Sequence, residues 1–336
     1  AFLSEADAAG RTKKDEMRKS IGFGCMLALV ANRYFDNPFQ SFHEESDLNM
    51  DPFLVGYYPL GMHLMGITAW IGKECSEKEV SDIHFLARDG YLVQKAYERV
   101  AGIQKEDAPK AHYLYASRKA LLCGMIQSEQ DFFCLPVVFG NHTPKSLLEM
   151  LEFAAEPEMT MEDQKKLLSD SGIDYEKRFL DEETYIRFMN IFISSIYSPK
   201  QLQESRELAG RYYEQIGANH MTFDMGYSGR IQTAISNLLG RGVDVLFIHS
   251  DSEHSARMQR IGNYTIYPLY PDIPKVSGLL REHLLSDHGP ACIGFEQRGG
   301  DVQPKLEPEE KIYQDTFIIS AIQKAALQFV EDFIVT

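Results

Sequence analysis

The chain has 336 residues, of which 44% are apolar and 25% charged, so it can bury a sizeable core. The net charge of −15 argues against binding of nucleic acid, because no Lys/Arg-rich stripe is available to offset phosphate repulsion. A small phosphorylated ligand held by a few arginines is compatible with this charge.

The first 80 residues are expected to form an N-terminal helical part. Apolar residues recur at helical spacing from Thr12 to Phe35, and Asn37-Pro38 ends this helix. The segment from Phe53 to Gly72 has no charged side chain and is as long as a membrane span. It also holds Pro59, His63 and four glycines, so a buried helix or helix pair is favoured and no membrane span is expected.

From Asp82 onward, strands alternate with helices, which is typical of a parallel sheet with crossover helices. The expected strands are residues 84–87, 113–116, 221–224 and 243–249, with 261–269 as an edge strand. The expected helices are residues 91–100, a helix starting at 117–122, and residues 230–239. The predicted fold class is therefore α/β and Rossmann-like, a mostly parallel sheet with helices on both faces, built from residues 81–142 and 218–300.

Between the two halves of this sheet domain, residues 143–217 show helical patterns only. Thr143-Pro144 begins the block with a capping side chain followed by proline at the first helical position. The block is expected to be a helical insertion, or cap. Within the last part, residues 301–336, an amphipathic helix is expected over 312–333 and should pack on the sheet domain.

Two strand-to-helix junctions carry the most informative side chains. Residues 83–91 and 221–230 each pass from a short apolar strand through an acid and a glycine into a helix. A helix N-terminus offers unpaired N–H groups and the positive end of its dipole, which favour an anion such as a phosphate. The junctions therefore predict a phosphate or sugar-phosphate site, with Asp89 and Asp224 as the candidate catalytic residues.

The candidate ligand-binding residues all lie where a predicted strand ends. They offer guanidinium groups, hydroxyl groups or a backbone that a ligand can approach closely: Arg88, Gly90, Ser117, Arg118, Gly226, Tyr227, Ser228, Gly229 and Arg230. A purely structural explanation competes with this one, in which Asp89 and Ser228 cap helices, the glycines form turns and the arginines lie in ion pairs. The cofactor is left open, and Mg²⁺ is the candidate if Asp89 or Asp224 is a metal ligand rather than a base.

Weaker patterns lie elsewhere in the chain. His249, Asp251 and His254 could hold a metal, and Glu282-His283 could be an acid/base pair, but structural roles are favoured for both groups. The five cysteines are scattered and odd in number, so neither a zinc site nor a disulfide framework is indicated. A reducing cytoplasm is the expected location.

Several segments resemble a known family. Together they are similar to the region that follows the phosphatase domain in large bacterial proteins predicted to be haloacid dehalogenase (HAD) superfamily hydrolases: Tyr34-Phe-Asp-Asn-Pro-Phe39, Gly56-Tyr-Tyr-Pro-Leu-Gly61, Phe85-Leu-Ala-Arg-Asp-Gly-Tyr-Leu92, Tyr115-Ala-Ser-Arg-Lys119, Phe223-Asp-Met-Gly-Tyr-Ser-Gly-Arg-Ile-Gln232 and Glu282-His-Leu-Leu285. The resemblance spans most of the chain. It implies a role in surface-polysaccharide synthesis and an upstream phosphatase or glycosyltransferase domain as partner.

The chain departs from the superfamily at its nucleophile. The family motif is aspartate-x-aspartate followed by threonine or valine, whereas Asp89 is followed by Gly90 and Tyr91, and Asp224 by Met225 and Gly226. The resemblance therefore implies that the phosphatase core lies upstream and that hydrolase activity does not transfer to this region by name.

A weaker similarity is to type I phosphoribosyltransferases. In that family, a strand ending in acids leads into a loop that holds the ribose phosphate, and an earlier strand ends in a pyrophosphate loop. Asp224 with Ser228-Gly229, and Arg88 with Gly90, match these loops in order. Only one acid precedes the second loop, which leaves the contact to the ribose hydroxyls in doubt.

These observations predict an α/β domain that binds a phosphorylated sugar or nucleotide-type ligand. If the protein is an enzyme, phosphoryl, glycosyl or phosphoribosyl transfer is the expected chemistry. Two alternatives are a HAD-like hydrolase (phosphatase) whose catalytic motif lies outside this chain, and a non-catalytic docking or regulatory module of a glycosyltransferase.

Overall fold

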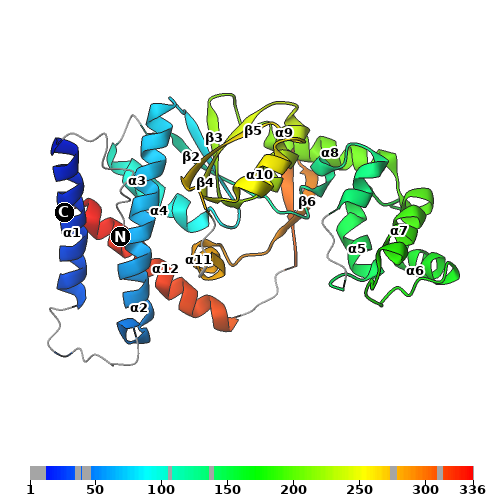
Figure 1. Cartoon of the computed structure of the whole chain (residues 1–336), viewed down its shortest axis with the longest axis horizontal. Coiled ribbons are helices and arrows are strands. Elements are labelled where there is room, and N and C mark those ends of the chain that lie inside the picture. Colours follow the sequence, from blue (N-terminus) through cyan, green and yellow to red (C-terminus); the bar gives the residue numbers. More distant parts are fainter. Residues whose placement is uncertain are drawn as a thin grey trace.

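A computed structural model of the chain describes residues 13–34, 39, 47–104, 108–135, 140–272, 278–308 and 313–335. Three regions follow one another along its longest axis (Figure 1). The N-terminal helices and the last helix form one end, the sheet lies in the centre, and the helices of the cap form the other end.

The N-terminal region contains α1 (Lys13–Tyr34), η2 (Asp47–Met50), α2 (Pro52–Val55), η3 (Gly56–Leu60) and α3 (Gly61–Glu77). The long helix predicted from Thr12 to Phe35 agrees with α1 to within the described residues. The uncharged segment forms α2, η3 and most of α3, and its Tyr57, Leu64 and Ile67 are almost completely buried. Among the residues described, none of the helices has the length and apolar character that a membrane crossing requires.

The central sheet has five parallel strands in the order β2-β1-β3-β4-β5. They are β1 (Asp82–Leu86), β2 (Lys110–Leu114), β3 (His220–Tyr227), β4 (Val243–Ser250) and β5 (Tyr264–Tyr270). Helices α4 (Tyr91–Gln104), α9 (Arg230–Leu239) and α10 (Ser252–Met258) follow β1, β3 and β4. The predicted Rossmann-like α/β fold is confirmed, and the last strand lies at the edge of the sheet as expected.

The helix expected to start at residues 117–122 does not form. After β2 the chain makes a turn and then a short 3-10 helix, η4 (Leu122–Met125). The Ser117 carbonyl accepts from Leu121 N (3.1 Å), but Leu122 N donates to Lys119 O (3.2 Å), which tightens the turn instead of continuing an α-helix. The Ser117 hydroxyl also accepts from Ala120 N (2.9 Å), which closes the turn.

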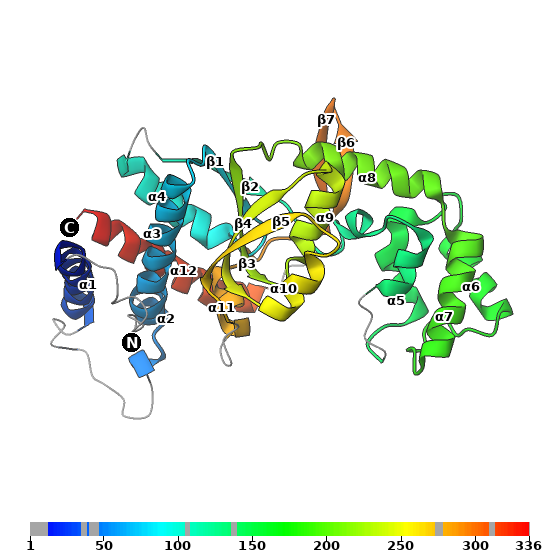
Figure 2. The same ribbon diagram turned by 45° about the horizontal axis from the view of Figure 1, so that its top comes forward.

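Helices cover both faces of the sheet, as predicted. Side chains alternate along each strand, so Ile83 and Phe85 enter the core shared with α3, α4 and α12. Leu86 and Val243 point the other way and pack with α9 and with α8 (Pro199–Tyr213). Turning the molecule by 45° shows the two helical layers on either side of the strands (Figure 2).

The insertion between β2 and β3 is helical, as the sequence indicates. It contains η5 (Glu129–Cys134), α5 (Pro144–Leu151), η6 (Glu152–Ala154), α6 (Met161–Asp170), α7 (Glu182–Ile191), η7 (Phe192–Ile196) and α8. The Thr143 side chain accepts from Ser146 N (3.1 Å), which is the predicted cap of α5. Buried residues such as Leu147, Phe188 and Phe192 give the cap a core of its own.

The C-terminal region contains α11 (Gly278–Leu285), a hairpin of β6 (Cys292–Arg298) and β7 (Asp301–Leu306), and α12 (Tyr313–Ile334). The antiparallel hairpin was not predicted from the sequence. It packs on α8, where the Phe295 and Tyr212 rings are 4.6 Å apart. Helix α12 agrees with the predicted helix and lies against η3 and α3, where Gly61 faces Phe329.

The close approach of α12 to η3 predicts a specific packing defect. A Cβ at Gly56 would lie 2.1 Å from the Ile322 carbonyl oxygen, so Gly56→Ala should lower the free energy of unfolding by about 1–3 kcal/mol through overpacking. The matched control is Gly66→Ala in α3, where nothing lies within 4 Å of the added Cβ, and where alanine should gain up to about 1 kcal/mol. Urea unfolding of the two variants measures the difference, and equal stabilities would contradict this packing.

Candidate functional site

The two junction loops lie side by side at the carboxyl edge of the sheet. Strands β1 and β3 are parallel neighbours, with Ile83 opposite Met221 and Phe85 opposite Phe223. Chain order reverses between these two strands, and the crevice at such a reversal is where open α/β sheets bind ligands. The two loops therefore meet on one edge of the sheet.

Three carboxyl groups meet at this edge. Asp224 is 9% exposed on the α9 side of β3, where Gln232 Nε2 donates to its Oδ2 (3.0 Å). Burial first, and then the negative charge of Asp89, raise the pKa of Asp224 to about 7. Burial followed by Asp89 also raises the pKa of Glu282. The cluster of three carboxyl groups therefore retains a proton close to neutral pH, as a general acid or base needs.

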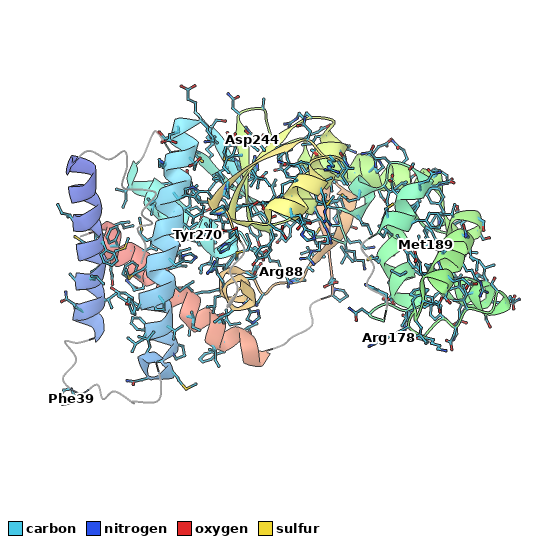
Figure 3. The ribbon with its side chains drawn as sticks, viewed as in Figure 1. Phe39, Arg88, Arg178, Met189, Asp244 and Tyr270 are labelled. Carbon is cyan, nitrogen blue, oxygen red and sulfur yellow. The ribbon has the colours of Figure 1, made fainter. Side chains whose placement is uncertain are left out.

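Asp89 is held by the residue that directly follows α11 and does not cap α4. Ser286 Oγ donates to Asp89 Oδ1 (2.6 Å), and Asp287 N donates to the Arg88 carbonyl (3.0 Å). Burial raises the pKa of Asp89, while the hydrogen bond from Ser286 and the charges of Arg88 and Arg118 oppose that rise. Arg88 lies beside α11 beneath the sheet (Figure 3). The carboxylate is thus fixed in position and not used as a helix cap.

Three arginines face the carboxyl groups or each other. Arg88 Nη1 donates to the Gly289 carbonyl (3.4 Å), and its charge acts on Asp89 and Glu282. Burial lowers the pKa of Arg230, and the nearby charge of Arg118 lowers it further. In the described part of the chain, neither Arg118 nor Arg230 has a carboxylate within ion-pair distance. Two neighbouring guanidinium groups with no carboxylate in ion-pair contact are suited to hold an anion.

The end of β3 and the loop that follows it have a shape that only glycine permits at two places. Gly226 has φ +116 and Gly229 has φ +81, and an added Cβ would lie 1.9 Å from His249 O and 2.3 Å from Tyr264 Oη respectively. Ser228 does not cap α9, because the N-cap residue is Gly229 and no side chain bonds to the first turn. The first N–H groups of α9 are therefore not satisfied by a capping side chain.

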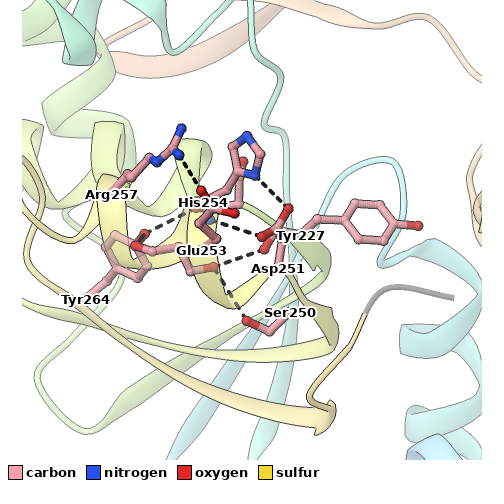
Figure 4. Close-up of polar contacts among 9 residues, drawn as sticks. Tyr227, Ser250, Asp251, Glu253, His254, Arg257 and Tyr264 are labelled. Atoms are coloured by element: carbon pink, nitrogen blue, oxygen red, sulfur yellow. Dashed lines mark hydrogen bonds and ion pairs between the residues drawn. The ribbon is translucent and has the colours of Figure 1, made fainter. Parts of the chain in front are cut away.

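A polar network anchors this loop from the side of α10 (Figure 4). Ser255 Oγ donates to the Tyr227 carbonyl (3.1 Å), and Tyr264 Oη donates to the carbonyls of Ser228 (3.3 Å) and Ser255 (3.2 Å). The Tyr227 ring extends away from the network (Figure 4) and stacks on His249, with ring centroids 6.4 Å apart. Its pKa is raised by burial first and then by Glu282, so the phenol lies on the side of the carboxyl groups.

The remaining predicted residues have structural partners. Ser117 Oγ donates to Cys292 O (2.5 Å) and accepts from Ala120 N. A Cβ at Gly90 would lie 2.8 Å from the Leu86 carbonyl oxygen, so glycine is required for the tight turn after β1. A binding role for either residue stays a prediction.

The histidines suggested as metal ligands lie apart. His254 Nδ1 is 2.7 Å from Asp251 Oδ2, whereas His249 contacts Arg281 and the Asp272 carbonyl. Among the described residues, no group of three or more acidic, histidine or cysteine side chains is arranged to hold a metal ion.

Sequence reasoning missed two contributors to the site. Ser286, directly after α11, donates to Asp89, and no local pattern indicates that contact. Tyr113 of β2 has a buried hydroxyl without a hydrogen-bond partner in the described structure. Its pKa is raised by burial first and then by acidic neighbours that include Asp287 and Asp89, which places the phenol beside the site. An unsatisfied buried hydroxyl next to an anion site can donate to a ligand.

Another polar cluster lies at the opposite end of the sheet. His84 Nε2 is 2.9 Å from His220 Nδ1, and Asp82 contacts both His112 (2.7 Å) and His220 (3.3 Å). Burial lowers the pKa of His84 to about 3, so this side chain stays neutral inside the sheet. The cluster is far along the strands from the junction loops and takes no part in their site.

Comparisons with known proteins leave the family open. No protein-family model matches this chain, and no curated protein matches it significantly. The resemblances to HAD-associated regions and to phosphoribosyltransferases therefore stay predictions.

Proposed function

We propose that the carboxyl edge between β1 and β3 binds a phosphorylated ligand of the sugar-phosphate or nucleotide type. The observation that carries this proposal is the proximity of Arg118 and Arg230, which line the same cavity, repel each other and have no carboxylate within ion-pair distance in the described structure. A phosphate between them would relieve the repulsion and accept charge-assisted hydrogen bonds from both. The uncapped N-terminus of α9 adds favourable dipoles beside Arg230.

The three carboxyl groups supply what a transfer reaction needs beside a bound phosphate. Asp224, with a pKa of about 7, can accept or donate a proton near neutral pH. Asp89 and Glu282 can accept hydrogen bonds from sugar hydroxyls, and the arginines stabilise negative charge as a bond to phosphorus or to an anomeric carbon breaks. Phosphoryl or glycosyl-type transfer is therefore the proposed chemistry.

A thermal-shift screen tests the proposal. Phosphate, ribose 5-phosphate, glucose 1-phosphate and adenosine monophosphate should include compounds that raise the melting temperature of the wild type, because a ligand bound only to the folded state stabilises it. The Arg230→Gln variant should show no rise with the same compounds.

The matched control is Arg178→Gln, which removes the same charge from an exposed position in the cap, far from Arg88 (Figure 3). This control should respond to ligand as the wild type does. Absence of any shift with every phosphorylated compound would contradict the proposal and favour the non-catalytic docking module. Equal loss of response in both variants would show that only overall charge matters.

A further inference from the structure

A cavity of about 220 Å³ lies next to the two arginines, on the α9 face of the sheet. Arg118 and Arg230 both line it, so it continues directly from the proposed phosphate position. The same Arg118 acts on Asp89 and Glu282, which places the carboxyl groups on its other side. A ligand held at the arginines thus faces the carboxyl groups on one side and the cavity on the other.

The walls of the cavity are mainly aliphatic. They include Leu122, Met125, Ile126, Leu135, Ile231 and Ile261, and no aromatic ring lies among the described residues that line it. Besides the arginines, Asp131 and Cys134 are its polar residues, and the Asp131 carboxylate already accepts from Gln127 N (2.9 Å) and Ser128 N (2.7 Å). Among the described residues of the cavity, a nucleobase would find neither a stacking surface nor an array of free hydrogen-bonding groups.

The cavity wall is held firmly in place. Arg206 of α8 donates to the carbonyls of Cys123 (3.0 Å) and Ile126, and Asn237 Nδ2 donates to the Gly124 carbonyl (3.2 Å). A Cβ at Gly124 would lie 2.7 Å from the Ala234 carbonyl oxygen, so this segment packs directly on α9. The wall is therefore built by defined contacts, which favours a preformed pocket over a chance gap between loops.

We infer that the phosphorylated ligand carries an aliphatic chain, of alkyl or isoprenoid type, which occupies this cavity while its phosphate lies between Arg118 and Arg230. Since a dry apolar cavity of about 150 Å³ takes up a six-carbon ring, this one accommodates about six to nine carbons. The inference rests on the proposed function and narrows it, because it excludes a nucleobase on this side of the phosphate. A sugar group of the ligand would then lie on the side of Asp89 and Glu282.

Calorimetric titration of the purified chain with methyl phosphate, n-hexyl phosphate and adenosine monophosphate tests the inference. Hexyl phosphate has five more methylenes than methyl phosphate, and binding in the cavity removes them from water. Even if only half of their transfer free energy is realised, hexyl phosphate should bind at least about 30-fold more tightly than methyl phosphate. Adenosine monophosphate should bind no more tightly than methyl phosphate. Binding of all three should be at least about tenfold weaker in Arg230→Gln.

Two isoleucines of equal exposure provide a matched pair of variants. Ile261 lines the cavity and is 53% exposed, and Ile103 in α4 is 54% exposed, so glutamine is tolerated at both positions without loss of core packing. Ile261→Gln should weaken hexyl phosphate about fivefold and leave methyl phosphate unchanged. Ile103→Gln should change neither affinity.

The outcomes separate the two proposals. If methyl and hexyl phosphate bind equally, both through Arg230, the aliphatic inference is overturned and the proposed function stands. Tighter binding of adenosine monophosphate than of hexyl phosphate overturns the inference in favour of a nucleotide. If no phosphate binds, the proposed function fails and the inference fails with it.

Discussion

Replacing both Arg118 and Arg230 with glutamine is expected to weaken phosphate-monoester binding by about 100-fold or more. Each guanidinium group contributes charge-assisted hydrogen bonds worth roughly 1.5–3 kcal/mol to a bound anion. The free energy of unfolding should stay equal or rise, because burial and the charge of Arg118 already disfavour the charged form of Arg230. Calorimetric titration together with urea unfolding measures both quantities.

Weaker binding together with equal or higher stability distinguishes a binding role of the two arginines from a structural one. If the two arginines had only a structural role, replacing them would lower the free energy of unfolding more than it would weaken ligand binding. The control is Arg211→Gln, since Arg211 donates to Gln297 on the surface and lies outside the junction loops. If the double variant unfolds more easily and binds the ligand as well as the wild type, the two arginines serve the fold and the anion site is contradicted.

Asp224→Asn is expected to change how stability depends on pH. The pKa of Asp224 is raised to about 7 in the folded protein, first by burial and then by Asp89, whereas an unfolded aspartate titrates near 4. Between these values the folded state keeps a proton that the unfolded chain has lost. This contribution to stability is therefore complete below pH 4 and is lost as the pH rises towards 7, by as much as about 4 kcal/mol.

Asparagine has the same shape and no charge to lose. The free energy of unfolding of Asp224→Asn, relative to that of the wild type, should therefore increase by about 2–3 kcal/mol as the pH rises from 5 to 8. Urea unfolding at the two pH values measures this change, with Asp244→Asn at the opposite end of the neighbouring strand (Figure 3) as a control for the substitution itself. Parallel pH profiles for the wild type and Asp224→Asn would show that no proton is held at this position.

If the site is catalytic, the same variant should lose turnover and keep its affinity. A proton carrier contributes typically 10²–10⁴-fold to a rate, whereas the arginines that bind the phosphate are unchanged. The pH profile of wild-type turnover should then show a group with a pKa of about 7. Unchanged turnover in Asp224→Asn would remove the carboxyl group from the chemistry.

Local sequence patterns were sufficient for the sheet edge but not for its surroundings. A strand that ends in an acid and a glycine before a helix specifies a junction, and parallel pairing of β1 with β3 then brings the two junctions together. The contact from Ser286 could not be foreseen, because it joins residues 197 positions apart through tertiary packing. The same holds for the cavity, whose walls come from η4, η5, α9 and the residues after α10.

The turn after β2 shows why one local prediction was wrong. Residues 117–122 have helix-forming side chains, but the chain has to leave the sheet there and enter the cap. The Ser117 hydroxyl and the contact of Gly124 with α9 fix a turn and a 3-10 helix instead. Packing against a distant helix overrides helix propensity in such a short segment. Arg118 owes its position beside Arg230 to this turn.

The most direct measurement is the position of a bound anion. Crystals soaked in tungstate, a heavy-atom mimic of phosphate, give an anomalous signal that locates the bound oxyanion directly. The strongest peak should lie between the guanidinium groups of Arg118 and Arg230, beside the first turn of α9. A peak found only elsewhere, for example in the surface groove lined by Arg206, Arg211 and Arg241, would contradict an anion site at the β1–β3 edge.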